Sequence, residues 1–530
     1  MIPRRGFLKQ AGAAGVIGSA AYLLRAPDGG GWNAGAATAN AMNGIAPAEA
    51  TKDFKPDIEL ELNAITDEVG LLPGGPTSVW RFTGKVLRGK ADSLSFLEAA
   101  AGGLRFVPVI RVRRGQKVRI FFNNRLPEDT IVHWHGLHIV QRMDGHPMYA
   151  IGNGKRYVYE FAVGNRAGTY WFHPHPHGRT GYQVYRGLTG LFLVADEEED
   201  AARLPGGEHD LPLIIQDRSF DPGNQLVYLG RGMMERMMGF MGERVLVNAS
   251  PDYLRQVERR AYRLRLFNGS NSTGYLLSLS DGRPFVVIGT DGGLLEQAMT
   301  RQSLTLAVAE RADVWVDFGT MRPGQELSLV ATPFAPMMAG GGRMGGRGMM
   351  GMMGRAASIE PRSIARFRAG NGAASRSPLP KRLSKFPSLS VRDAVNRERP
   401  REINLAMMRG QALLNGRSFE MESVAEDERV RLGATEVWDF VNDSPMAHPM
   451  HVHNLQFKVI QRIGAAASDR AGLAAGFTDE GLKDVVLVLP GERVRVLMKF
   501  EDYTGLYLYH CHILEHEDLG MMRNYLVERG

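Results

Sequence analysis

Eight histidines in this chain form four H-x-H pairs, two in the first part of the sequence and two near its end. The pairs are His133 and His135, His173 and His175, His451 and His453, and His510 and His512. On an extended strand, residues i and i+2 point to the same face, so each pair can direct two imidazoles into one cavity. Eight imidazoles are too many for one metal ion and suit three. The fold must therefore bring two distant parts of the chain together around a shared metal cluster.

The chain has one cysteine, Cys511, which lies between His510 and His512 in the run HCHILEHEDLGMM. A lone thiol forms no intramolecular disulfide, so Cys511 is not a structural cross-link. One Cys, two His and a Met are the ligands of a blue-copper electron-transfer site, and His516 and Met521 follow in the same run. An electron that reaches the thiolate could pass through a few main-chain bonds to metals held by the neighbouring histidines.

The histidines alone do not name the metal, because imidazole suits copper, zinc and iron alike. A single H-x-H pair is common by chance, but four pairs, one of them flanking the only cysteine, favour a metal-binding role. Four other histidines of the chain are predicted to be non-ligands. They are His138, His146, His177 and His209, of which His177 continues the second pair.

In their order along the chain, these clusters resemble those of the multicopper oxidases. The resemblance covers nearly the whole chain after the N-terminal segment, and its closest likeness is to bacterial cuprous oxidases and laccases. The motifs that carry it are HWHGLH from His133, GTYWFHPHPHG from Gly168, RLRLFNGSNS from Arg263, DGG from Asp291, ERADVWVDF from Glu310, HPMHVH from His448 and HCHILEHEDLGMM from His510.

The resemblance implies four copper ions: one of type 1, one of type 2 and a pair of type 3. The matching ligands are His448, Cys511, His516 and Met521 for type 1, His133 and His451 for type 2, and His135, His173, His175, His453, His510 and His512 for type 3. Met522 directly follows Met521, but the spacing from His516 favours Met521. A weak axial Met implies a lower type 1 potential than Leu or Phe would give.

Two carboxylates are candidates for proton delivery. Reduction of dioxygen to water consumes protons, which copper-bound imidazoles do not readily supply, so a nearby acid is needed. Asp144 matches the family's acid near type 2 copper, and Glu517, directly after His516, matches the acid that serves the type 3 pair. The alternative for each is a solvated loop carboxylate.

Short runs that alternate apolar and polar residues, such as RFVPVIRVRRGQKVRIFFNN, predict an all-β protein. A chain of 530 residues suits about three domains. We predict three cupredoxin-like Greek-key β-sandwiches. Their expected ranges are 51–199, 208–369 with Met-rich loops, and 390–530 after a linker over 370–389. The trinuclear cluster should then lie between the first and third domains, with the second as a spacer.

Residues 1–50 are predicted to be a twin-arginine signal. Arg4 and Arg5 begin the pattern RRGFLK, and the weakly apolar run AGAAGVIGSAAYLL follows. This predicts export of a folded protein to the periplasm, with an uncertain cleavage point. We expect no integral membrane segment, because the chain has no sufficiently long apolar stretch. We also expect no nucleic-acid partner, and a monomer.

The chain has 26 methionines, and thioethers select Cu(I) among copper ions. Met233, Met237 and Met241 are spaced to share one face of a short helix, although a core stripe is equally consistent with this spacing. A Gly- and Arg-rich segment carries further candidates for substrate Cu(I): Met337, Met338, Met349, Met350, Met352 and Met353. Met446 and Met407 match substrate positions of the cuprous oxidases. Those enzymes carry a Met-rich insert after the position of Met407, and this chain lacks it. Ser444 stands where those enzymes have an acidic residue.

The sequence therefore predicts an enzyme that takes single electrons at type 1 copper and reduces O2 to water at a trinuclear cluster. Cu(I) is the favoured donor, and phenols or other aromatics are the laccase-type alternative. A copper-free envelope scaffold of the same fold should lack Cys511 or several histidines, and none is missing. A copper nitrite reductase normally has two domains and fewer histidines.

Overall fold

A computed structural model of the chain describes residues 45–98, 103–334, 360–375, 378–408, 410–464 and 471–530. Most of the signal segment 1–50 therefore lies outside the described residues, as do the candidates Met337, Met338, Met349, Met350, Met352 and Met353. These assignments stay predictions. Strands dominate the described part of the chain and confirm the all-β class.

The first sandwich has two sheets, with strand orders β2-β1-β5-β7 and β3-β4-β9-β8-β6. Its strands are β1 (Ile58–Val69), β2 (Thr77–Arg88), β3 (Leu94–Glu98), β4 (Arg105–Arg113), β5 (Lys117–Asn124), β6 (Val132–His135), β7 (Arg156–Ala162), β8 (Gly168–Pro174) and β9 (Gly190–Ala195). Burial alternates along β5, as its pattern of apolar and polar residues predicts. Leu60 and Val118 of one sheet share a buried core with Trp134 and Phe172 of the other.

The second sandwich pairs a seven-stranded sheet, order β11-β10-β14-β19-β16-β17 with β12 beside β10, with a sheet of order β13-β21-β20-β15-β18. The strands are β10 (Asp210–Phe220), β11 (Leu226–Val227), β12 (Arg244–Val247), β13 (Tyr253–Val257), β14 (Ala261–Asn268), β15 (Gly274–Leu279), β16 (Phe285–Thr290), β17 (Gly293–Arg301), β18 (Leu304–Leu306), β19 (Arg311–Asp317), β20 (Glu326–Phe334) and β21 (Arg362–Ala369). Leu264, Leu277 and Phe367 lie in its core. Leu383, from the predicted linker, packs into the same core.

The third sandwich has sheets of order β23-β22-β25-β30-β27-β28 and β24-β32-β31-β26-β29. The strands are β22 (Arg401–Met408), β23 (Gln411–Leu414), β24 (Arg429–Arg431), β25 (Thr435–Asn442), β26 (His448–Val452), β27 (Phe457–Ile463), β28 (Leu482–Lys483), β29 (Val485–Val488), β30 (Arg493–Lys499), β31 (Gly505–Cys511) and β32 (Met522–Glu528). Trp438 of the first sheet packs against Tyr509 and Tyr525 of the second, with ring centroids 5.6 and 5.8 Å apart.

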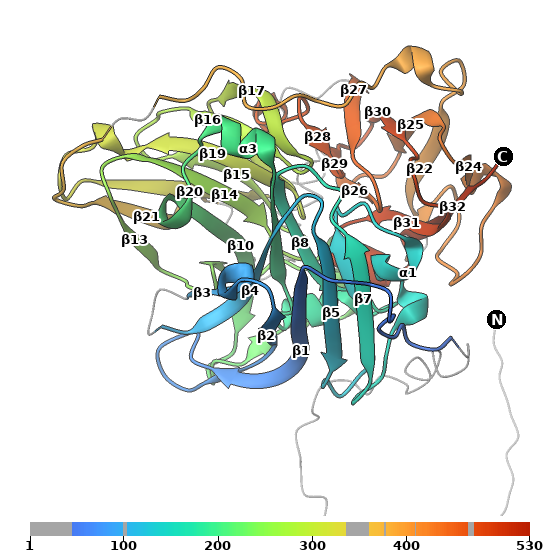
Figure 1. The fold of residues 1–530 in the computed structure, drawn as a ribbon, viewed down its shortest axis with the longest axis horizontal. Coiled ribbons are helices and arrows are strands. Elements are labelled where there is room, and N and C mark those ends of the chain that lie inside the picture. The colour runs from blue at the N-terminus through green and yellow to red at the C-terminus, as the bar shows by residue number, and fades with distance from the viewer. Residues whose placement is uncertain (1–44, 99–102, 335–359, 376–377, 409, 465–470) are drawn as a thin grey trace, which may run out of the picture.

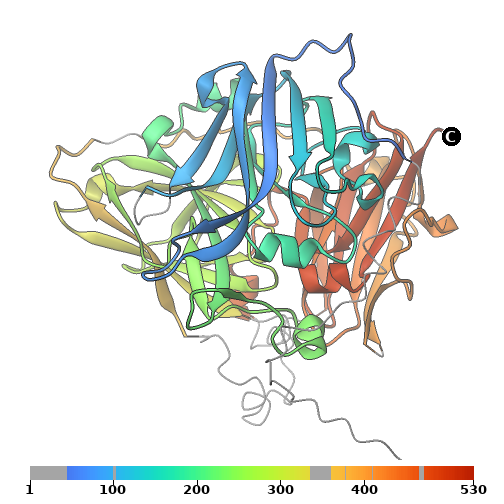
Figure 2. The same ribbon diagram turned by 90° about the horizontal axis from the view of Figure 1, so that it is seen from below.

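All three sandwiches contact one another. Figure 1 shows the first (blue to cyan) between the second (green and yellow) and the third (orange and red), and Figure 2 shows the same arrangement from below. Trp171 of the first sandwich, Phe267 of the second and Val485 of the third lie in one buried apolar cluster. Ala307 of the second packs with Leu487 of the third. The histidine-bearing strands β6, β8, β26 and β31 belong to the two sandwiches that the sequence predicted.

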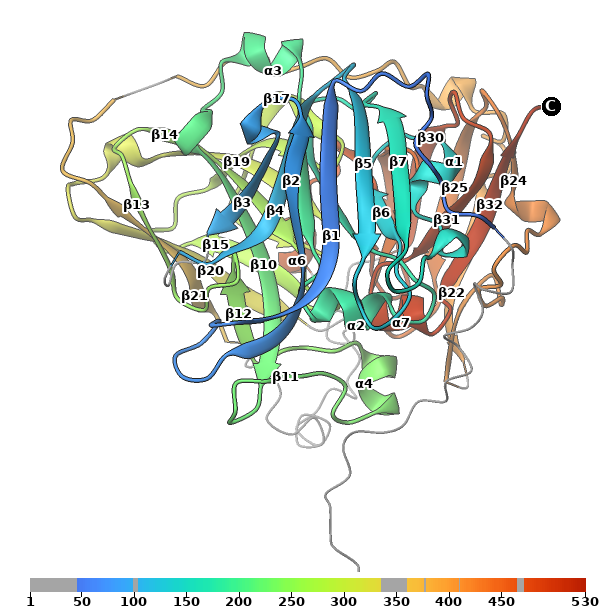
Figure 3. The ribbon, with the colours of Figure 1, turned by 60° about the horizontal axis from the view of Figure 1, so that its bottom comes forward.

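The helices are short: α1 (Gln141–Asp144), α2 (Thr180–Tyr185), α3 (Glu197–Ala202), α4 (Met233–Met238), α6 (Ala471–Ala474) and α7 (Leu514–Asp518). Among the described residues, none of the helices has the length and apolar character needed to cross a bilayer. The Met-rich helix is shorter than its spacing predicted. It ends before Gly239, whose φ of 81° leaves the helical region, so Met241 lies outside it. Figure 3 shows α4 beneath α2 and α7.

Candidate metal centre

Strand pairing brings the histidines of the first sandwich together. β6 and β8 are antiparallel, and His133 lies directly opposite His173. Because alternate residues share a face, His135 and His175 follow on the same side. The ring centroid of His133 lies 5.5 Å from that of His173 and also 5.5 Å from that of His175. All four side chains are fully buried.

The third sandwich repeats this arrangement. β26 and β31 are antiparallel, with His451 opposite His510 and Met450 opposite Cys511. The two sets of histidines meet where the sandwiches contact each other. His135 stacks on His451 with ring centroids 3.8 Å apart, and His133 stacks on His453 at 3.7 Å. The structure thus brings together all eight histidines of the four H-x-H pairs.

Several imidazole nitrogens of the cluster are directed at one another. His133 Nδ1 donates to the Asp144 main-chain oxygen at 2.6 Å, and His451 Nδ1 donates to that of Asp484 at 2.7 Å. A carbonyl only accepts, so each Nε2 carries a lone pair, and these two atoms lie 3.5 Å apart. Burial lowers the pKa of both rings well below its usual value, which keeps them neutral. Two lone pairs that face each other can both bind one cation, so these residues fit a metal ion.

Other nitrogens of the cluster have no hydrogen-bond partner among the described residues, although they are buried. They are His135 Nδ1, His173 Nε2, and both ring nitrogens of His175 and His512. Buried polar groups normally have a partner. Four triads in this region, with ligand atoms within 4.8 Å of one another, have the geometry to hold an ion: His133 with His135 and His173, His133 with His451 and His453, His175 with His453 and His510, and His135 with His451 and Asp484. Which histidines bind which type of copper stays a prediction.

Cys511 forms a separate triad with His448 and His516. The thiol Sγ lies 3.4 Å from His448 Nδ1 and 3.7 Å from His516 Nδ1, and all three side chains are fully buried. The other ring nitrogens are held in place, since His516 Nε2 donates to the Met237 main-chain oxygen at 3.1 Å and His448 Nε2 lies 2.7 Å from Ser444 Oγ. Burial raises the pKa of the Cys511 thiol. A thiolate here therefore needs a cation beside it, as a bound metal would supply.

Met521 is positioned beside this triad by its main chain. Its N–H donates to the His516 oxygen at 2.9 Å, and its oxygen accepts from the Cys511 N–H at 3.0 Å. The Met521 side chain is fully buried in the same core as Cys511. Met522 lies opposite His510 and packs in a different cluster with Phe419. This arrangement is consistent with the choice of Met521.

Asp144 is completely buried, which excludes the alternative of a solvated loop carboxylate. Its Oδ2 lies 2.7 Å from His453 Nδ1, and its Oδ1 lies 3.6 Å from His133 Nδ1. Burial raises the pKa of this carboxyl well above its usual range. Asp144 therefore contacts histidines of both sandwiches and can hold a proton beside the cluster.

Glu517 lies on α7 and is 2% exposed. Its two carboxyl oxygens lie 3.6 Å from His175 Nε2 and 3.3 Å from His510 Nδ1. Burial, followed by the neighbouring Asp518, raises the pKa of Glu517 well above its usual range. It too is no solvated loop residue.

The candidate substrate methionines within the described residues lie in different surroundings. Met446 is 3% exposed, and its main-chain oxygen accepts from Asn442 and Ser444. Met407 lies on β22 at the edge of the third core. On α4, Met233 and Met234 are 59% and 47% exposed. The four histidines predicted as non-ligands belong to none of the candidate metal triads among the described residues.

Sequence reasoning missed Asp484, whose Oδ1 lies 3.1 Å from His135 Nε2. It also assigned no role to Arg311 or Asp291, although their motifs were noted. A signal was available: Lys483 and Asp484 are a charged pair directly before the apolar run VVLVLP, and both are buried. Buried charges require partners, so such a pair predicts an ionic contact with another part of the chain.

Three β-sandwiches, with a His–Cys–His triad beside an eight-histidine cluster between the first and third, define a class of copper-dependent, O2-reducing oxidoreductases. Family models described as multicopper oxidase match residues 394–530 and 100–199. The chain is 31% identical over 422 residues to multicopper oxidase mco of Staphylococcus haemolyticus, with 78% of this chain and 80% of that protein covered. It is 30% identical to a laccase of Bacillus subtilis, covering 78% of this chain and 87% of that protein.

A solved structure, the McoA multicopper oxidase of Aquifex aeolicus, superposes with a TM-score of 0.73 at 33% identity, covering 90% of this chain and 97% of that chain. The chain belongs to the multicopper oxidase family.

Proposed function

We propose that this multicopper oxidase couples four one-electron oxidations at the His448–Cys511–His516 triad to the reduction of O2 to two waters at the eight-histidine cluster. The observation that carries the proposal is that Cys511 is flanked in the chain by His510 and His512, both part of that cluster. A covalent path of a few bonds therefore joins the two sites. Copper bound at these positions would supply the one-electron redox chemistry.

The remaining residues have supporting roles in this proposal. Imidazoles from both sandwiches hold the cluster in a buried site from which bulk water is excluded. Asp144 and Glu517 hold protons beside different histidines of the cluster. Four protons and four electrons convert one O2 into two waters, so the two carboxyls must be recharged from solvent during each turnover.

For the electron donor we propose Cu(I), which is oxidised to Cu(II) one electron at a time. The Met237 oxygen accepts the His516 Nε2 hydrogen bond, so the Met-rich helix α4 lies directly over a ligand of the triad. Met233 and Met234 expose their thioethers on the same helix, and thioethers favour Cu(I). A cuprous ion held on α4 would thus be separated from His516 by only the helix itself. Oxidation of phenols or other aromatics is the second candidate, favoured by the laccase relative.

Substituting Met233, Met234 and Met237 together by leucine should lower the rate of Cu(I) oxidation by about tenfold, the low end of the effect of losing groups around a metal site. Leucine matches methionine in volume and helix propensity, so the fold should be retained. The measurement is O2 consumption with Cu(I) and, separately, with a phenol. Phenol oxidation should be unchanged, because the triad is untouched.

Met299→Leu is the matched control, since Met299 lies on β17 and packs on the core of the second sandwich. A second variant combines deletion of residues 337–353 with Met446→Leu, and its O2 consumption is measured in the same way. If Cu(I) turnover in this variant and in the triple leucine variant equals that of the unmodified protein, the proposed donor is wrong. A phenol rate that far exceeds the Cu(I) rate would favour the laccase-type function instead.

Copper loading tests the proposal as a whole. We expect about four copper ions per chain with blue absorption, from the ligand sets above. Since copper binds the folded state, loading should stabilise each site by about 2.7 kcal/mol at a hundredfold excess over Kd and raise the melting temperature by about 5 °C or more. Metal analysis and calorimetry before and after chelation measure both. A chain that takes up no copper would instead be a scaffold of the same fold.

A further inference from the structure

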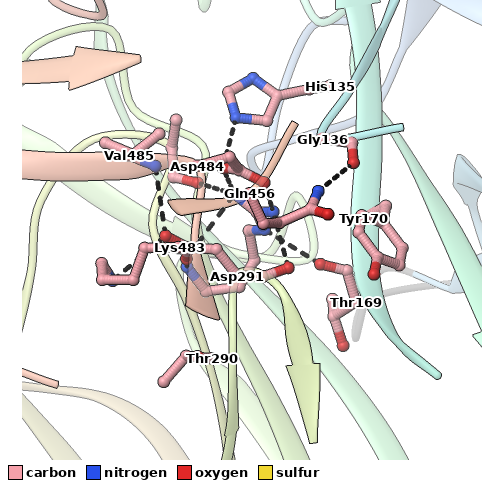
Figure 4. Close-up of polar contacts among 12 residues, drawn as sticks. His135, Gly136, Thr169, Tyr170, Thr290, Asp291, Gln456, Lys483, Asp484 and Val485 are labelled. Atoms are coloured by element: carbon pink, nitrogen blue, oxygen red, sulfur yellow. Dashed lines mark hydrogen bonds and ion pairs between the residues drawn. The ribbon is translucent and has the colours of Figure 1, made fainter. Parts of the chain in front are cut away.

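Five charged side chains are buried where the three sandwiches meet, and Figure 4 shows three of them, Asp291, Lys483 and Asp484. Asp291, Glu310 and Arg311 come from the second sandwich, and Lys483 and Asp484 from the third; all have side-chain exposures of 8% or less. Lys483 Nζ lies 3.1 Å from Asp291 and 2.9 Å from Glu310. No member of this junction is among the predicted copper ligands, and burying so many charges is unfavourable unless every one is paired.

Asp484 holds two histidines of the cluster at once. Its Oδ1 lies 3.1 Å from His135 Nε2, and its main-chain oxygen accepts from His451 Nδ1 at 2.7 Å. The rings of these two histidines are nearly parallel, with an interplanar angle of 10°. With its Nε2 engaged by Asp484, His135 has only Nδ1 left to bind a metal, and Nδ1 has no other partner among the described residues. Asp484 therefore determines which nitrogen of His135 faces the cluster.

Arg311 fixes Asp484 in turn. Its two Nη atoms bind the two carboxylate oxygens at 2.7 and 2.6 Å, the bidentate geometry that lysine cannot reproduce. Its remaining hydrogen bonds go to the main-chain oxygens of Thr169, Ala309 and Asp291, between 2.9 and 3.1 Å. Arg311 is thus bonded to all three sandwiches, and its guanidinium has little freedom to turn.

The residue after His135 is a glycine because of this contact. A Cβ at Gly136 would lie 2.4 Å from Asp484 Oδ2 and 3.2 Å from Arg311 Nη2, and Gly136 has a φ of +85°. Any larger residue would push the carboxylate and the guanidinium away from the His135 strand. The close approach of β6 to the junction is therefore part of how His135 is held.

We infer that Arg311 is a positioning residue through which the second sandwich, beyond acting as a spacer, sets the orientation of His135 and His451 by way of Asp484. The inference rests on the proposed copper cluster. Its consequence is local: the triad around Cys511 is held by Ser444 and Met237 and has no bond to Arg311 or Asp484. Loss of the junction should disturb the trinuclear cluster and leave the type 1 site intact.

The test is Arg311→Lys in the full chain, loaded with copper alone and analysed by metal content, electron paramagnetic resonance and absorption spectroscopy. We expect type 2 and type 3 signatures to weaken with a 10- to 100-fold loss of copper affinity, about the effect of losing a group that orients a metal ligand, while the blue type 1 band is retained. Arg462→Lys is the matched control, because Arg462 also pairs with two acids, Asp479 and Glu492, away from any predicted ligand. It should leave all copper signatures unchanged.

A charge-neutral double variant, Arg311→Met with Asp484→Leu, covers the case in which Arg311→Lys does not fold, since it leaves no unpaired charge of that pair. It removes the partner of His135 but keeps the main-chain partner of His451. We expect the type 3 absorption to fall more than the type 2 resonance. Unchanged trinuclear spectra, or parallel loss of type 1 and trinuclear copper, would overturn the inference. If the unmodified chain itself lacks trinuclear copper, the proposed function fails instead.

Discussion

Replacing Cys511 by serine should remove the blue absorption and reduce oxidase turnover by more than about 100-fold. Groups that merely surround a metal site cost about 10- to 100-fold when lost. Cys511 is expected to do more, because it supplies the only thiolate of the chain and is joined through the main chain to His510 and His512. Serine preserves the size of the side chain, but its hydroxyl is a poor ligand for copper. The donor would then have no site at which to deliver its electron.

The proposed trinuclear cluster should survive this change. None of its eight histidines is altered, so type 2 resonance and type 3 absorption should persist while type 1 absorption disappears. Met522→Leu is a suitable control, since Met522 is equally buried and lies opposite His510 on β32. Turnover above a tenth of the original in Cys511→Ser, for Cu(I) and phenol alike, would contradict the proposed electron path.

The sequence was informative where function depends on strand periodicity. H-x-H spacing places two residues on one face of an extended segment. β6 contains both histidines of its pair, whereas β8, β26 and β31 each contain the first histidine and end directly before the second. The direct opposition of His133 to His173, and of His451 to His510, follows from register, which no spacing within one strand reveals. Their meeting across two sandwiches could be inferred only because too many imidazoles were present for one metal.

The individual residue pairs that join the second and third sandwiches were beyond sequence reasoning. Asp484 and Arg311 are far apart in the chain, and only the packing of the third sandwich on the second places them 2.6 Å apart. The Met-rich helix shows a different limit. The i, i+4 spacing predicted one helical face with Met233, Met237 and Met241. The helix contains Met233 and Met237, but it ends before Gly239, so Met241 is not part of it. A glycine inside a periodic pattern can end a helix or be tolerated, and local pattern alone does not decide between the two.

Replacing Glu517 by glutamine should slow O2 reduction by about 100-fold or more, the usual contribution of a positioned general acid. Glutamine has nearly the same shape and polarity, but it has no carboxyl proton to release. The two carboxyl oxygens of Glu517 lie 3.6 and 3.3 Å from the rings of His175 and His510, whereas the two histidines of the Cys511 triad are held by Ser444 and Met237. Electron uptake at type 1 should therefore be unaffected.

Glu515→Gln separates this role from a general effect of altering α7. Glu515 is just as buried and lies on the same helix, but its carboxyl accepts from Tyr228 and Asn271 at 2.7 and 3.0 Å. Stopped-flow measurement would follow anaerobic bleaching of the blue band by the donor and its recovery after mixing with O2. In Glu517→Gln bleaching should keep its rate and recovery should slow, whereas in Glu515→Gln recovery should stay within a few-fold. Equal slowing of recovery in both variants would assign the effect to the helix, because of these two glutamates only Glu517 has its carboxyl beside the histidines.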